Sequence, residues 1–319
     1  MSTAETTNIM QKHKKSLAVN ELSPISNAIW HLLFIVGSLL CILPIWIVVA
    51  ASLTQEKALL LNGYGFWPSE FSVTAYTFLI KSGGGIVLTA YRNTILATVF
   101  GTILCVLSVG LYSYPLSRPD FRYSRFFTFF SFFSMLFNAG TIPFYLLAKS
   151  VLHLNNTLFA LFLPLSFSAY WVIIMRTFYK SNVPDAVIES ARIDGAGEWR
   201  TLLQIVTPLA LPGLATVALF AAVGIWNNFF LCLLLVNKDD YINLQYMIYR
   251  ILRSIQYLKE MASASSGSGS VAAGMAMSDM PAESFRMAMA VVTMGPIILA
   301  YPFFQKYFVK GLTIGAVKG

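Results

Sequence analysis

The feature that most constrains this chain is a series of long apolar stretches without charged side chains. A helix needs about 20 mostly apolar residues to cross the hydrocarbon core of a bilayer. Six runs free of Asp, Glu, Lys and Arg are available for this: Ile29–Ala51, Asn93–Ser117, Phe126–Ala148, Leu154–Met175, Thr201–Asn237 and Met287–Gln305. These runs are continuously apolar, whereas strands of a membrane barrel alternate. The sequence therefore predicts an all-α integral membrane protein with six transmembrane helices.

The fifth run is too long for a single span and contains Pro208 and Pro212. We expect its membrane part to cover Leu211–Val236, and its first portion to belong to the preceding connection.

Composition supports lipid as the surrounding solvent. Of the 319 residues, 57% are hydrophobic and 11% are charged, whereas soluble domains carry about 25% charged residues. A soluble protein this apolar could not cover its surface with polar groups. Membrane lipid is therefore an expected partner of the chain.

Six spans place both termini on one side, and the positive-inside rule places that side in the cytoplasm. The clearest evidence is the short loop 118–125, which holds three arginines and one aspartate. The segments predicted to be cytoplasmic contain Lys12, Lys14, Lys15, Arg118, Arg122, Arg125, Arg176, Lys180, Arg192, Arg200, Lys306, Lys310 and Lys318. The net charge of +8 is then explained by the cytoplasmic lysines and arginines that set the orientation and interact with anionic lipid headgroups. No nucleic-acid-binding surface is expected.

The chain divides into residues 1–28 as a cytoplasmic N-terminal tail, 29–310 as the transmembrane domain and 311–319 as a cytoplasmic C-terminal tail. An external loop is expected over 237–286. It opens with an amphipathic stretch, Tyr241–Lys259, and continues into a Gly/Ser-rich piece at 262–270. Such a piece has no core of its own, so the loop either only connects two spans or contacts an external partner.

The residues expected within the bilayer offer no catalytic machinery. Intramembrane enzymes need positioned ionisable groups, and the predicted spans contain no Asp, Glu, Lys or Arg except at their ends. Zinc-protease, nucleophile-elbow and phosphate-loop motifs are absent from the sequence. The three cysteines lie in predicted spans without CxxC spacing, so neither a disulfide nor a metal site is indicated. We therefore expect no enzyme activity, cofactor or metal on this chain, an intramembrane enzyme being the less favoured alternative.

The connection between the fourth and fifth spans, 181–208, has an unusual pattern. Pro184 can occupy a first helical turn, residues 185–194 can continue the helix, and Asp194-Gly195 can end it, since glycine tolerates positive φ. A second helix can follow Gly197, with Trp199, Leu202, Leu203 and Val206 spaced as a one-sided apolar stripe. Two short helices joined at a glycine form a compact knob for a cytoplasmic partner. The alternative is an amphipathic hairpin that rests on lipid headgroups.

This segment resembles the coupling motif of permease subunits of binding-protein-dependent ABC importers, written E-A-A-x3-G-x9-I-x-x-P. Glu189, Ala191, Gly195, Ile205 and Pro208 match it, and Ser190 replaces the usual alanine. The triplet Asp194-Gly195-Ala196 is similar to the carbohydrate-transporting branch. Further stretches resemble that branch: Arg92-Asn93-Thr94, Tyr112–Arg118, Gly140–Tyr145, Trp226-Asn227-Asn228 and the C-terminus 310–319, the last resembling the MalG-like subunit of maltose-type importers.

The resemblance implies a subunit of a sugar importer in the bacterial plasma (inner) membrane. Its partners would be a second permease, two ATPase subunits that carry ATP and Mg, and an external or periplasmic solute-binding protein. The residues implied to contact the ATPase are Glu189, Ser190, Ala191, Asp194, Gly195, Ala196, Trp199, Ile205 and Pro208. The implied tail contacts are Gly311, Leu312, Thr313, Gly315, Lys318 and Gly319, the alternative being a frayed C-terminus. An importer of amino acids or peptides would share the coupling motif and stays open.

Polar and amphipathic residues at membrane depth are candidates for the solute path, because sugars bind through hydrogen bonds and aromatic stacking. These candidates are Asn93, Asn138, Tyr170, Trp171, Trp226, Asn227 and Asn228. Helix–helix hydrogen bonding and interfacial anchoring are the alternative uses for such residues.

Overall fold

The computed structural model describes residues 23–137, 139–264 and 282–316, and this part of the chain is helical with one isolated bridge between Thr54 and Phe71. The α-helices are α2 (Pro24–Ser52), α3 (Glu56–Asn62), α4 (Thr74–Ser117), α5 (Ser124–Leu136), α6 (Thr141–Leu146), α7 (Ala169–Asn182), α8 (Asp185–Ile193), α9 (Glu198–Arg200), α10 (Thr207–Leu209), α11 (Leu211–Trp226), α12 (Phe230–Leu235), α13 (Leu244–Ala264) and α15 (Ala282–Ala316). Shorter turns are the π-helices η1 (Leu147–Val151) and η4 (Thr201–Val206), and the 3₁₀ helices η2 (Leu158–Leu161), η3 (Leu163–Leu165) and η5 (Asp239–Tyr241). The expected all-helical class is confirmed.

Within the described residues, two helices are long and apolar enough to cross a bilayer without a break: Pro24–Ser52 and Gly85–Ser117. Up to five spans result if each of three bent helix pairs counts as one. The third, fourth and fifth expected spans were predicted as continuous helices, whereas in the structure each is a pair of helices with a bend between them. The count of six stays a prediction, with α15 as the sixth candidate.

Prolines and polar side chains account for the interruptions that the structure describes. The fourth expected span bends by 49° between Leu158–Leu165 and Ala169–Asn182, next to Pro164. The fifth bends by 78° before Leu211, so α11 begins where the sequence analysis placed the membrane part. A second break follows Trp226, where the Asn228 side chain accepts a hydrogen bond from the Leu231 amide and caps α12. Backbone groups freed at such breaks need new partners in a bilayer.

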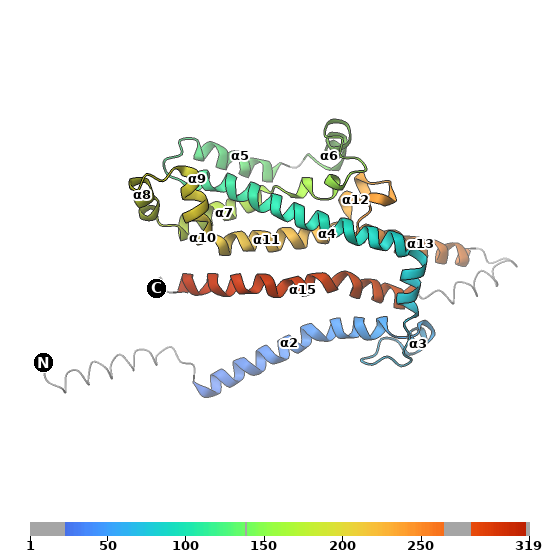
Figure 1. The fold of residues 1–319 in the computed structure, drawn as a ribbon. Helices are drawn as coiled ribbons and strands as arrows, with labels where there is room; N and C mark the ends of the chain where they lie inside the picture. The colour runs from blue at the N-terminus through green and yellow to red at the C-terminus, as the bar shows by residue number, and fades with distance from the viewer. Residues whose placement is uncertain (1–22, 138, 265–281, 317–319) are drawn as a thin grey trace, which may run out of the picture.

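Helix α4 is the central element and extends from the α3 end of the molecule to the α8 end (Figure 1). It packs against α7, α11, α13 and α15. Small residues permit the close approach: a Cβ atom on Gly101 would lie 2.7 Å from both Ile225 Cδ1 and Phe162 Cβ. Tight approach through small residues is how helices associate in lipid, where apolar burial provides no driving force.

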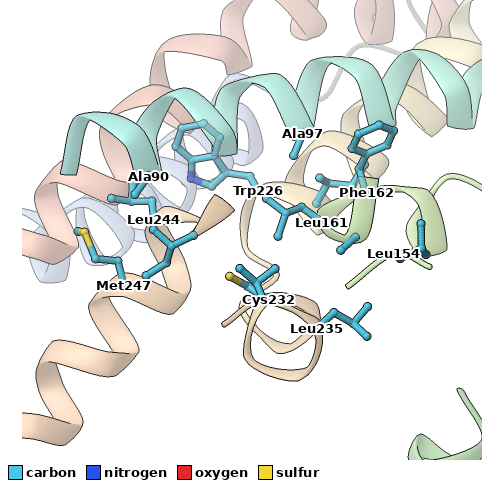
Figure 2. Packing of buried hydrophobic residues seen from close by; sticks show 14 of the residues in the cluster. Ala90, Ala97, Leu154, Leu161, Phe162, Trp226, Cys232, Leu235, Leu244 and Met247 are labelled. Atoms are coloured by element: carbon cyan, nitrogen blue, oxygen red, sulfur yellow. The ribbon is translucent and has the colours of Figure 1, made fainter. Parts of the chain in front are cut away.

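Two groups of buried side chains lie along α4. The first surrounds Ala90 and Ala97 and includes Trp226, Leu244 and Met247 (Figure 2). The second surrounds Val109 and includes Met175, Ile188 and Val206, and it lies at the α8 end. Because Ile188 and Val206 come from α8 and η4, the segment between the fourth and fifth expected spans is part of the packed core.

In helix α2, no residue of the most apolar stretch is buried within the chain, whereas part of the corresponding stretch of α4 is buried. It lies beside α15. It exposes large apolar side chains such as Leu32, Phe34 and Leu40. Lipid is the physically expected environment for such a surface.

A buried carboxylate connects the end of α2 to α15. Glu56, at the start of α3, accepts hydrogen bonds from the Glu283 and Ser284 amides, both at 2.9 Å, and from the Ser284 hydroxyl at 2.8 Å. These amides belong to the first turn of α15, where backbone donors have no partner within the helix and the helix dipole favours an anion. Glu56 therefore caps α15 from another element.

We expect Glu56→Gln to lower the stability of the folded protein by about 1–3 kcal/mol, because an amide group would face donors that need an acceptor. Thermal unfolding in detergent measures the effect. Glu70→Gln is the matched control, since Glu70 is exposed. Equal melting temperatures for Glu56→Gln and the control would contradict this role for Glu56.

Candidate functional site

The segment between α7 and α11 forms two short helices joined at a glycine. Helix α8 is followed by Gly195 with φ +77°, and the chain becomes helical again at Glu198. The Gly195 amide donates to Arg192 O and the Ala196 amide to Ala191 O, at 3.0 and 2.9 Å. This is the Schellman pattern that ends a helix through a left-handed glycine. Pro184 lies one residue before α8, in extended conformation, and not in the first turn as the sequence analysis predicted.

One face of this helix pair is buried against the rest of the molecule. Ile188, Ala191, Leu202 and Val206 pack with the cluster at the α8 end. The opposite face exposes large apolar side chains: Ile193 is 86%, Trp199 is 69% and Leu203 is 60% exposed. We name Ile193, Trp199 and Leu203 the exposed apolar face.

The apolar stripe predicted for the second helix is therefore divided. Leu202 and Val206 are buried, whereas Trp199 and Leu203 are exposed. Residues 201–206 are π-helical, and a π-turn holds more residues than an α-turn. The α-helical spacing used for the prediction does not hold there, so side chains assigned to one face separate onto two.

A network of charged and polar side chains ties the pair to the end of α4. The Arg192 guanidinium lies 2.5 Å from Asp120 and 2.9 Å from Glu198. The Tyr114 hydroxyl donates to Glu198 at 3.1 Å, and the Arg118 guanidinium lies 3.2 Å from Asp185. Hydrogen bonds to Asp120 and then Glu198 raise the pKa of Arg192 above its ordinary value, so its charge persists at every accessible pH.

This network was not found by sequence reasoning, which used Arg118 and Arg192 only for orientation. The available signal was the close spacing of opposite charges, Arg118 with Asp120 and Arg192 with Asp194 and Glu198. Only the tertiary structure shows which of these charges meet. A hollow of about 390 Å³ lies between the network and Trp199.

The remaining residues of the expected coupling motif lie on or near the pair. Glu189, Ser190, Asp194 and Pro208 are exposed, and Ala196 and Ile205 are half-buried. The Ser190 hydroxyl donates to Ala186 O at 2.9 Å within α8, so the serine is accommodated without a change in the helix.

The predicted tail residues Gly311, Leu312, Thr313 and Gly315 lie in the last turns of α15, which continues to Ala316. Lys318 and Gly319 lie outside the described residues.

The solute-path candidates fall into two groups. Tyr170 is exposed on α7, and Trp171 stacks on Phe220 of α11 with ring centroids 5.2 Å apart. The second group, Trp226 and Asn227, lies at the end of α11. Trp226 is buried and its Nε1 donates to Thr293 O at 3.1 Å, while Asn227 is exposed. Asn138 lies outside the described residues.

Two asparagines of this set, Asn93 and Asn228, form hydrogen bonds that connect helices to neighbouring segments. The Asn93 side chain is buried and donates to Asp240 O and Ile242 O, at 2.8 and 3.0 Å. Asn228 caps α12, and its carbonyl accepts a hydrogen bond from the Asn243 side chain at 2.5 Å. These contacts favour the alternative of helix–helix hydrogen bonding for Asn93 and Asn228.

Among the described residues, no group of three or more His, Cys, Asp or Glu side chains could hold a metal ion. The site consists of a packed helix pair, a network of ion pairs and an exposed apolar face. It belongs to a chain whose apolar helices are long enough to cross a bilayer. This arrangement is typical of the membrane-embedded component of a multi-subunit transporter.

Comparison with known families agrees with this class. Residues 103–314 match the family described as "Binding-protein-dependent transport system inner membrane component". This match covers more than half of the chain, and the chain belongs to that family.

Individual relatives are similar over most of their length. The chain is 34% identical to the polygalacturonan/rhamnogalacturonan transport system permease protein YtcP of Bacillus subtilis (strain 168), over 88% of this chain and 94% of the relative. It is 33% identical to protein LplC of the same organism, over 91% and 94%. A crystal structure of a bacterial ABC transporter involved in the import of the acidic polysaccharide alginate contains a chain with TM-score 0.70 and 29% identity, over 89% of this chain and 96% of that one.

We expect Arg192→Gln to loosen the helix pair, because it removes both ion pairs that join α8 to Asp120 and Glu198. Hydrogen–deuterium exchange across residues 185–200 should become about two- to fivefold faster, as expected for exposed pairs. Arg200→Gln is the matched control, since Arg200 donates a hydrogen bond to Gln204, four residues further along the same helix pair. Unchanged exchange in Arg192→Gln would show that apolar packing alone holds the pair.

Proposed function

We propose that this chain is a permease subunit of an ATP-driven sugar importer, and that its helix pair 185–208 docks into a cytoplasmic ATPase subunit. In this proposal six spans cross the bacterial inner membrane and both termini are cytoplasmic. A second permease completes the path, two ATPase subunits bind and hydrolyse ATP, and a solute-binding protein delivers the solute from outside.

The observation that carries the proposal is the exposed apolar face on a helix pair that is otherwise well packed. Large apolar side chains in water are costly, and their clustering marks an interaction site. A buried tryptophan is among the commonest anchors of a protein interface. Trp199 and Ile193 therefore need a cleft in a partner, and the coupling motif indicates an ATPase subunit.

The packing of the pair supports transmission of movement. Ile188 and Val206 join the core around α4 and α7, and Arg192 joins the pair to Asp120. Because packed cores do not deform continuously, a displacement of the pair would move α4 and α7 as a body. ATP binding in the partner would in this way reorient the solute path.

The names of the relatives support an oligosaccharide as solute. YtcP is named for polygalacturonan and rhamnogalacturonan, and further relatives with 26–28% identity are named for arabinooligosaccharides. The solute-path candidates Tyr170, Trp171 and Asn227 would contact it in this proposal.

Gly195 offers a sharp test of the coupling assignment. We expect Gly195→Val to abolish ATP-dependent uptake by proteoliposomes while the protein still inserts, because a β-branched residue does not tolerate φ +77°. Gly195→Asn is the matched control: asparagine tolerates this conformation, and a Cβ atom at this position meets nothing within 4 Å. Uptake at the unmodified rate in Gly195→Val would refute the assignment.

The exposed apolar face makes a separate prediction. Trp199→Ala should reduce co-purification of the ATPase subunits at least about tenfold, as expected for an interface anchor. Trp67→Ala is the control, because Trp67 is also exposed and belongs to the connection between α3 and α4. Helix α3 lies at the end of α4 opposite α8. If both variants retain the ATPase equally, the pair docks elsewhere.

A further inference from the structure

Helix α13 has two chemically different faces. Leu244, Met247 and the half-buried Ile251 and Ile255 pack into the cluster around Ala90. The other face carries Tyr246, Tyr249, Arg250, Arg253, Ser254 and Tyr257, of which Tyr246 is half-buried and also contacts that cluster. These positions repeat at the three- and four-residue spacing of one helical face, and we name them the Tyr/Arg stripe.

The aromatic rings of the stripe are held in place by stacking. Tyr249 lies between Phe229 and Tyr246, with ring centroids 5.2 and 6.4 Å away and interplanar angles of 27° and 23°. Tyr257, further along the stripe, is 62% exposed. Stacking therefore occupies the Tyr249 ring, and Tyr257 offers the open aromatic surface of the stripe.

The arginines are positioned by the same rings and by one ion pair. Arg253 Nε donates to the Tyr249 hydroxyl at 3.2 Å, and the Arg253 guanidinium lies 5.5 Å from the centre of that ring. Arg250 lies 2.6 Å from Asp239. Since a guanidinium has five donors, Arg250 keeps donors for a ligand while it holds Asp239.

The stripe borders a shallow hollow of about 440 Å³. From Tyr246 to Tyr257 it extends about 16 Å along the helix, from the α-helical rise per residue. Its first turn adjoins the break between α11 and α12 through the Phe229–Tyr249 stack and the Asn243–Asn228 hydrogen bond. It lies at the end of α4 opposite α8 (Figure 1).

We propose that the Tyr/Arg stripe of α13 binds an acidic oligosaccharide, with the exposed Tyr257 ring under a sugar face and Arg250 and Arg253 on the carboxylates. This inference rests on the proposed function, in which α13 is external. Sugar rings present apolar C–H faces that suit exposed aromatic rings. Guanidinium groups only donate hydrogen bonds, so they match carboxylates, which only accept. A neutral sugar could also hydrogen-bond to the hydroxyl groups of the stripe, but it would bring no negative charge to the two guanidinium groups.

Binding is tested on the full permease with its co-purifying subunits in nanodiscs, without a binding protein. Two probes are compared: trigalacturonate, whose carboxyl groups are charged, and its methyl ester, in which each is capped and neutral. We expect the acid to bind more tightly, and Arg253→Gln to weaken its binding about tenfold, the loss of one charge-assisted contact. Binding of the ester should not change, and Arg253→Lys should restore part of the affinity for the acid.

Arg286→Gln is the matched control, because Arg286 is an equally exposed arginine on α15 outside the stripe. The proposal is overturned if wild type binds acid and ester equally, or if Arg253→Gln binds the acid as wild type does. It is also overturned if Arg253→Gln weakens only stimulation of the ATPase by the binding protein, to the same extent with either probe. The stripe would then dock that protein.

Uptake by proteoliposomes separates this inference from the proposed function. If no oligosaccharide enters with ATP, the proposed function fails. If oligosaccharides enter but the stripe variants leave the preference for acid over ester unchanged, only the assignment of the stripe fails.

Discussion

Close packing along α4 is the constraint on which the rest of the structure depends. In lipid, apolar burial gives helices no reason to associate, so the contact must come from dense packing and shared hydrogen bonds. Gly101 admits Ile225 and Phe162 at a distance that a Cβ atom would block. Helices α7, α11 and α15 pack around α4. The exposed apolar face lies towards one end of α4, and the Tyr/Arg stripe lies towards the other.

These two surfaces differ in the interactions they offer. At the α8 end the exposed apolar face is large and uncharged, while the adjoining charges are already paired within the chain. Such a surface suits a protein cleft that excludes water. At the α13 end the stripe combines ordered rings with guanidinium groups, which suits a polar ligand with apolar faces. In the proposed function, the same bundle thus separates attachment to a partner from contact with a solute.

Local chemistry explains what could be predicted from the sequence. Runs without charge predicted helices in lipid, and the left-handed turn at Gly195 followed from Asp194-Gly195 beside a helical stretch. Breaks at Ala210 and after Trp226 were only partly foreseen, because Pro212 is visible locally but the capping role of Asn228 depends on where Leu231 and Asn243 lie. The division of Trp199 and Leu203 from Leu202 could not be predicted from α-helical spacing, since residues 201–206 form a π-turn, which is rare.

The sequence by itself determined the solvent, the helical class and the glycine joint, because hydrophobicity, charge spacing and backbone freedom are properties of residues and their near neighbours. The tertiary structure alone decided which charges meet, which apolar residues stay exposed and which asparagines serve as structural links. Arg192 could have paired with several acids, and the fold places it beside Asp120, just after α4, and beside Glu198, at the start of α9. Asn93 likewise meets residues 240 and 242 only because the fold returns the chain there. Such contacts join residues far apart in sequence, and their energies depend on distances that no local pattern encodes.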